Sequence, residues 1–248
     1  MTAKRKLGLL LWGAGLLGVI AMVGLVFPRL IETLPEMLGD EPLPLPPGML
    51  VVLSLVQSSV LLALAVWAGV ALSPAVGLRA PAFEAAVMRQ SVVSALRPQL
   101  VPGVLAGIVG GAMLIAFWRF APPQILAAQE RVAAMPLIVR VLYGGITEEL
   151  LLRWGFMTLL VWLAWRFFAR ASAWVWVAIV VSALVFALGH LPAAVLLVGP
   201  LNATIIAYVT VGNALFGIVF GWLFWRYGLE AAILAHALTH VVKYVVSG

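Results

Sequence analysis

The length of the apolar runs is the feature that most constrains this chain. Residues 7–27 carry no charged, amide or hydroxyl side chain, and residues 49–72 carry no Asp, Glu, Lys or Arg. Runs of about 20 residues are long enough for an α-helix to cross the apolar layer of a bilayer. The runs do not alternate apolar and polar side chains, as the strands of a membrane barrel would. The sequence therefore predicts an all-α, multi-pass integral membrane bundle of about seven to eight transmembrane helices.

Composition supports this class. Of the 248 residues, 65% are hydrophobic and 10% are charged, whereas a soluble domain carries about 25% charged residues. The chain has no cysteine, so disulfides are excluded and any metal site would need His and carboxylate ligands. The net charge is +6, but the basic residues are scattered over short connections. That distribution is typical of a topology signal, and it argues against a nucleic-acid partner.

We predict membrane spans at about 7–27, 49–72, 100–120, 137–168, 174–191 and 229–246. Residues 193–228 are compatible with one span plus a re-entrant piece or with two short spans. Residues 73–99 suit a cytoplasmic loop with an interfacial helix. Three basic residues precede the first span, which predicts a cytoplasmic N-terminus, as in a bacterial cytoplasmic membrane: Lys4, Arg5 and Lys6.

Three charged residues lie close together within the span at 137–168: Glu148, Glu149 and Arg153. Together they cost about 8–10 kcal/mol on insertion scales, and the apolar neighbours return about 5–9 kcal/mol, so this helix should hide its charged face inside a bundle. Glu149 and Arg153 are four residues apart and can pair on one face. On an α-helix Glu148 points about 100° away from Glu149, so it is free to face another group. An ion pair that only stabilises packing explains Glu149 and Arg153, but it leaves the surplus Glu148 as a functional candidate.

The chain has three histidines, and all lie at or within predicted spans: His190, His236 and His240. A single histidine in a bundle is more often a hydrogen-bonded core residue than a catalytic one. His236 and His240 lie one turn apart, so they could form half of a zinc site, with His190 or Glu148 as a third ligand. The usual metalloprotease pattern has Glu after the first histidine, whereas this chain has Ala237 there.

These residues resemble the motifs of the CAAX protease and bacteriocin-processing (CPBP) family of intramembrane endopeptidases. The family pattern is Glu-Glu-x-x-x-Arg, then Phe-x-x-x-His, then His-x-x-x-Asn. This chain reads Glu148, Glu149 and Arg153, then Phe186 and His190, then His236 and His240. The one departure is His240, where the family usually has Asn. The resemblance covers about residues 137–246, so we divide the chain into N-terminal helices without a recognised motif (1–136) and a catalytic helical core (137–248).

The resemblance implies hydrolysis of a peptide bond near the membrane surface, without a covalent acyl-enzyme. It assigns Glu148, Glu149, His190, His236 and His240 to the catalytic site, with Arg153 and Phe186 in support. Glu148 with His190 would activate a water molecule, and His236 with His240 would stabilise the oxyanion. No cofactor is needed on this reading. In the alternative, zinc is bound by His190, His236 and His240, and Glu148 remains the base.

The expected partners are the lipid bilayer and a membrane-anchored protein or peptide. The substrate could be a prenylated C-terminus, a leader peptide or a C-terminal sorting tail. Two other functions stay open: a non-catalytic bacteriocin-immunity or scaffold protein of the same family, and a proton-coupled transporter. For the three motifs to meet at one depth, residues 193–228 should cross the membrane twice. That would make eight spans and open the site on the outer face.

Overall fold

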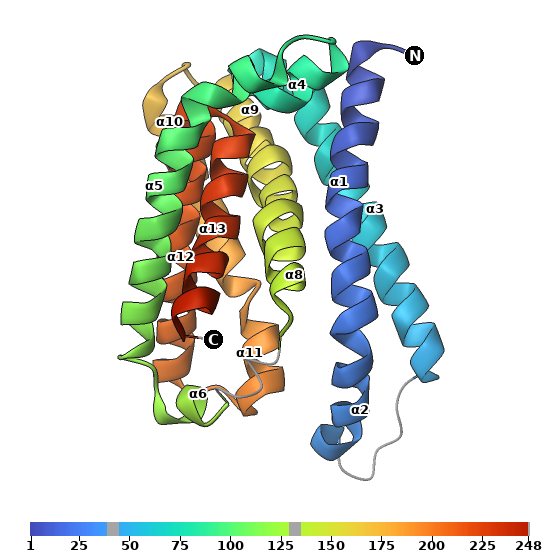
Figure 1. Cartoon of the computed structure of the whole chain (residues 1–248), viewed down its shortest axis with the longest axis vertical. Coiled ribbons are helices and arrows are strands. Elements are labelled where there is room, and N and C mark those ends of the chain that lie inside the picture. The colour runs from blue at the N-terminus through green and yellow to red at the C-terminus, as the bar shows by residue number, and fades with distance from the viewer. Residues whose placement is uncertain (39–44, 129–134, 248) are drawn as a thin grey trace.

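The computed structural model describes residues 1–38, 45–128 and 135–247, and within them every regular element is a helix (Figure 1). The helices are α1 (Ala3–Leu25), α2 (Phe27–Leu38), α3 (Pro47–Val76), α4 (Pro81–Val87), α5 (Val92–Trp118), α6 (Pro123–Ala127), α8 (Leu137–Val139), the π-helical stretches η1 (Arg140–Glu148) and η2 (Leu150–Met157), α9 (Thr158–Phe167), α10 (Ser172–Leu188), α11 (Leu191–Val198), α12 (Ala203–Tyr227) and α13 (Leu229–Ser247).

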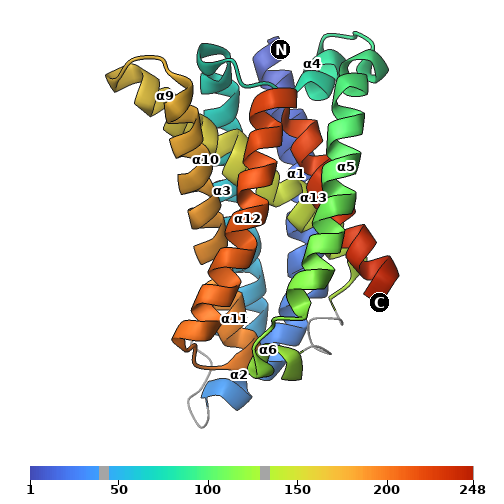
Figure 2. The same cartoon turned by 90° about the vertical axis from the view of Figure 1, so that its left-hand side faces the viewer.

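Seven helical segments of the described residues are long and apolar enough to cross a membrane. They confirm the all-α, multi-pass bundle, and the long helices run side by side in both views (Figures 1 and 2). Within 73–99 the structure has the short helix α4, and its interfacial location stays a prediction. Pro81 begins this helix because its fixed φ and missing N–H suit the first helical turn.

The prediction of two short spans within 193–228 is wrong, because α12 forms a single span over Ala203–Tyr227. Asn202 begins this helix, since its side-chain oxygen accepts a hydrogen bond from Ile205 N at 2.9 Å. Asn213 donates its side-chain amide to Val209 O at 2.8 Å. Its polar group is therefore satisfied within the helix. The expected total of eight spans falls with this prediction.

The charged span is one continuous helical segment, Leu137–Phe167, and most of its central part is π-helical. In a π-helix each backbone N–H reaches the carbonyl five residues back, so a turn is wider than in an α-helix. Two hydroxyls follow the same spacing: Thr147 Oγ1 lies 3.3 Å from Leu142 O, and Thr158 Oγ1 lies 3.3 Å from Arg153 O. π-Helical turns are rare and are often found at functional sites.

Two close helix contacts position this segment and α13. On α1, a Cβ added at Gly18 would meet Leu142 O and Thr147 Oγ1, so α1 lies directly against η1. On α5, a row of glycines faces α13. An added Cβ would lie 2.6 Å from Leu238 Cβ at Gly107 and 2.5 Å from Val242 Cβ at Gly111. Small residues let membrane helices pack closely. Helix α13 therefore lies against a face of α5 that glycines leave free of side chains.

Candidate functional site

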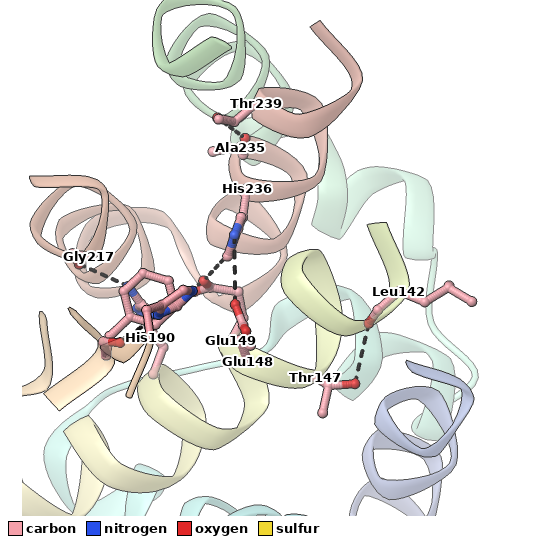
Figure 3. Close-up of polar contacts among 11 residues, drawn as sticks. Leu142, Thr147, Glu148, Glu149, His190, Gly217, Ala235, His236 and Thr239 are labelled. Carbon is pink, nitrogen blue, oxygen red and sulfur yellow. Dashed lines mark hydrogen bonds and ion pairs between the residues drawn. The ribbon is translucent and has the colours of Figure 1, made fainter. Parts of the chain in front are cut away.

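The motif residues come together inside the bundle, from the charged segment η1–η2, from α10 and from α13 (Figure 3). Glu148 ends η1, Glu149 links η1 to η2, and His190 follows α10. His236 lies in the interior of α13. The three sequence motifs thus meet in space, although α12 makes only one crossing. Glu149 and His236 both lie away from the ends of their spans, so they can meet whichever end of the bundle α13 starts from.

His236 lies at the centre of the site, because one ring nitrogen faces the carboxylate of Glu149 and the other faces that of Glu148. Nδ1 lies 2.8 Å from Glu149 Oε1. Nε2 lies 3.9 Å from Glu148 Oε2, which is too far for a direct hydrogen bond. Since a carboxylate only accepts, Nδ1 carries the proton of this bond. In the neutral imidazole, Nε2 is then a hydrogen-bond acceptor that faces Glu148.

The predicted Glu149–Arg153 pair is confirmed. Arg153 Nη1 lies 3.3 Å from Glu149 Oε1, and both side chains are fully buried. Arg153 Nη2 donates to Gly217 O at 3.2 Å, and its guanidinium carbon lies 4.7 Å from the centre of the Phe186 ring. A cation held by a carboxylate, a carbonyl and an aromatic face is compensated in an apolar interior. The pair therefore holds Glu149 in place against His236.

The prediction that Glu148 faces away from Glu149 is wrong, because both carboxylates approach the same imidazole. The 100° separation assumed an α-helix. In the wider π-helical turn, adjacent side chains diverge less. Glu148 keeps part of its exposure, with 16% of its side chain accessible, whereas Glu149 is fully buried. Glu148 is thus the carboxylate of the pair that an incoming molecule can reach.

His190 lies at the edge of the site. Its Nδ1 donates to Phe186 O at 2.8 Å, and its ring packs at 4.6 Å from the Phe186 ring, which also contacts His236 at 6.0 Å. No ion pair within 4.0 Å joins His190 to Glu148 among the described residues. We expected His190 to be the partner of Glu148. The imidazole that lies within 4.0 Å of the Glu148 carboxylate is instead that of His236.

His240 extends the site along α13. Its ring lies 5.1 Å from that of His236. A Cβ added at Gly144 would lie 3.1 Å from His240 Nε2 and 3.5 Å from His236 Nε2. The Gly144 backbone therefore lies against both imidazoles, on the same face of η1 from which Glu148 approaches. A larger residue at this position would fill the space beside the two rings.

Sequence reasoning missed two residues of the site. Phe220 of α12 stacks on His236, with ring centres 4.5 Å apart and planes inclined by 21°. Gly217 supplies the carbonyl for Arg153. Both belong to the glycine-rich stretch FGIVFG at 216–221, which carries no titratable group. Only the spacing of its glycines and aromatics could have indicated a contact with the charged segment.

The zinc alternative needs His190, His236 and His240 to point at one ion. Nδ1 of His236 is engaged by Glu149 and Nδ1 of His190 by Phe186 O, which leaves Nε2 of each ring as the nitrogen that could bind an ion. Over the parts of the chain that the structure describes, no group of three or more His, Asp or Glu side chains is arranged to hold a metal ion. The three histidines as they lie here do not form such a ligand set.

Comparison with known families gives one match. Residues 130–242 match the family model described as type II CAAX prenyl endopeptidase Rce1-like. This range contains every motif residue discussed above, from Glu148 to His240. The comparisons with curated proteins and with solved structures gave no match. The match confirms the family resemblance seen in the motifs. Together with the seven apolar helices, it supports an integral membrane protein whose residues 130–242 are similar to a protease family.

Proposed function

Because residues 130–242 belong to the Rce1-like family of type II CAAX prenyl endopeptidases, we propose that the chain hydrolyses a peptide bond of a membrane-anchored substrate, with a water molecule that Glu148 activates. The observation that carries this proposal is the 3.9 Å separation of Glu148 Oε2 and His236 Nε2. Two acceptors cannot hydrogen-bond to each other, but at this distance they suit a water molecule that donates one hydrogen to each.

In this mechanism the water oxygen attacks the carbonyl carbon while Glu148 accepts its proton. When the C–N bond breaks, Glu148 returns that proton to the leaving amine. Glu149 accepts from Nδ1 of His236 and thereby holds the imidazole with Nε2 towards the water. Arg153 compensates the charge of Glu149 and leaves Glu148 as the base.

The oxyanion would be stabilised by His240, which lies beside His236 and against Gly144. His can donate a hydrogen bond where the family usually has Asn, so the departure in the third motif is compatible with this role. His190 has its Nδ1 occupied by Phe186 O. We therefore place His190 at the edge of the site, where its Nε2 contacts substrate or passes a proton.

The first test compares membranes of a host that lacks the protein and is complemented with wild type, with Glu148→Gln or with Glu32→Gln. Glu32 is an exposed carboxylate on α2 and serves as the matched control. Mass spectrometry of C-terminal peptides from membrane-anchored proteins measures the conversion of precursor to product. We expect Glu148→Gln to reduce conversion by about 10²–10⁴-fold, while Glu32→Gln processes like wild type.

If Glu148→Gln restores processing fully, the catalytic assignment is wrong, and the non-catalytic immunity or scaffold role becomes the better explanation. A proton-coupled transporter would instead show Glu148-dependent transport with no change in the C-terminal peptides. Quantifying the Glu148→Gln protein in the same membranes shows whether a loss of processing reflects chemistry or a loss of the folded chain.

A further inference from the structure

The two ends of the helix bundle differ in charge. Helices α1, α5, α10 and α13 begin at one end, across which α4 lies (Figure 1). We call it the basic end, because it carries most of the Lys and Arg side chains of the described residues: Lys4, Arg5, Lys6, Arg79, Arg89, Arg97, Arg166, Arg170 and Arg226. The opposite end carries Arg29, Arg119, Arg140 and Lys243. Cytoplasmic connections between membrane spans carry an excess of Lys and Arg, so this asymmetry favours a cytoplasmic location for the basic end.

Helix α4 is tied across the basic end by two buried polar side chains. Glu230, near the start of α13, accepts a hydrogen bond from Ala82 N of α4 at 2.7 Å. Gln99 of α5 accepts one from Ala231 N at 3.0 Å, and the side chains of Gln99 and Glu230 are both buried. A cavity of about 330 Å³ also opens at this end, but none of the described residues that line it belongs to the three motifs. Helix α4 therefore covers the start of α13, between the basic end and His236.

The motif residues are displaced towards the opposite end of the bundle. Glu148 lies in the first half of the span Leu137–Phe167, which begins there (Figure 1). His190 follows α10, which ends there, and His240 lies in the second half of the span Leu229–Val246, which runs away from the basic end. Glu148 keeps 16% of its side chain accessible, and His190 is half-buried. The members of the site that an incoming molecule can reach therefore lie towards the end that α4 does not cover.

Building on the proposed function, we propose that the site opens on the non-cytoplasmic face, and that its substrate is an exported polypeptide anchored in the bilayer with the cleaved segment on that face. An extended peptide segment does not cross the apolar layer unaided, because its backbone groups lose their hydrogen bonds there. The substrate segment must therefore already lie on the side of the mouth. A lipid-modified C-terminus that stays in the cytoplasm would meet only the end that α4 covers. The inference thus disfavours one of the three substrate classes considered from sequence, the prenylated C-terminus.

The first arm of the test maps the two ends of the full chain in spheroplasts of a bacterial host. The chain has no cysteine, so a single introduced cysteine reports the face on which it lies. Gly48→Cys marks the opposite end, where an added Cβ has no heavy atom within 4 Å. Ala169→Cys marks the basic end at an exposed position between α9 and α10. We expect a membrane-impermeant maleimide to label Gly48→Cys in intact spheroplasts, and Ala169→Cys only after permeabilisation. The reverse pattern, or equal labelling of both, overturns the inference and leaves the endopeptidase proposal standing.

The second arm locates the products. Mass spectrometry compares the new peptide termini in a host that lacks the protein and is complemented with wild type or with Glu148→Gln. Proteinase K added to intact spheroplasts identifies the termini that lie on the non-cytoplasmic face. We expect the termini lost in Glu148→Gln to come from segments that the added protease removes. Glu148-dependent termini that are removed only after lysis overturn the inference but support the endopeptidase proposal. If no terminus depends on Glu148, the proposed function fails, and this inference fails with it even where the labelling is as expected.

Discussion

The N-terminal helices and the charged segment are both apolar enough to cross a membrane, yet the protein buries them to different extents. In α3, 11% of the most apolar window is buried, whereas the figure is 39% for both Leu137–Phe167 and Leu229–Val246. Side chains of α3 such as Leu61 and Leu64 are largely exposed, as expected for contact with lipid. The two more buried spans also have the lower mean hydropathy, 1.3 against 2.4 for α3, so the helices that carry the polar groups are the ones that occupy the centre of this bundle.

Helix α1 is intermediate in burial between α3 and the charged segment, and it contacts the charged segment directly. Thr147 donates to Gly15 O at 2.7 Å, so a backbone carbonyl of α1 satisfies a hydroxyl next to Glu148 and Glu149. From the other side, Trp154 donates its indole N–H to Val66 O of α3 at 3.2 Å. The N-terminal helices carry no motif, but they cover the face of the charged segment that is turned away from α13.

The largest effect is expected when the cation that pairs with the buried Glu149 is removed. Arg153→Met leaves Glu149 buried without its compensating cation and should lower the free energy of unfolding by about 3–5 kcal/mol. The double variant Glu149→Gln with Arg153→Met should recover part of this loss, because no charge is then left uncompensated. Thermal unfolding in detergent micelles measures both, with the exposed Arg166→Met as a control. Wild-type stability of Arg153→Met would contradict the pairing.

A smaller effect is expected where α1 meets the charged segment. Gly18→Val places a side chain against Leu142 O and Thr147 Oγ1 and should cost about 1–3 kcal/mol of stability. It should also lower kcat, because η1 carries Glu148. Gly13 lies on the same helix with no heavy atom within 4 Å of an added Cβ, so Gly13→Val should behave like wild type. If both variants are equally stable and active, α1 does not support η1.

The smallest effect tests the ring that stacks on His236. Phe220→Leu removes the stacked contact at 4.5 Å and should cost about 0.5–1.5 kcal/mol beyond the loss of apolar area. Because the imidazole loses one of its walls, kcat should fall more than KM changes. Phe120→Leu is the control, since Phe120 is 78% exposed. An identical response of the two variants in unfolding and in kcat would show that the stack has no special role.

The sequence predicts the helices well, because apolar length alone determines them. The Glu149–Arg153 pair follows from a spacing of four residues on a helix. The catalytic roles of the motif residues and the division of the chain after residue 136 stay predictions, as does the orientation of the N-terminus. The roles, the division and the orientation depend on chemistry and on membrane topology, which cannot be determined from how the helices pack.

Each error has its own cause. The two crossings of 193–228 were inferred from the need for the three motifs to meet at one depth, but Glu149 and His236 both lie away from the ends of their spans, so a single crossing by α12 is enough. The direction of Glu148 was wrong because periodicity analysis assumes α-helical turns, and nothing in the residue types of 140–157 marks the π-helix. The contact of Phe220 with His236 depends on how α12 lies against α13, which no spacing within one helix can reveal.

The glycine face of α5 has a consequence for how this protein can vary. The side chains of α13 lie directly against the glycine backbone of α5, so the location of the two imidazoles relative to Glu148 depends on Gly107 and Gly111, on a helix that bears none of the motif residues. A Gly→Ala exchange there is chemically mild, yet the added methyl group would press on Leu238 or Val242 and shift α13 as a unit. Substitutions that inactivate the protein can therefore arise on a helix with no chemistry of its own.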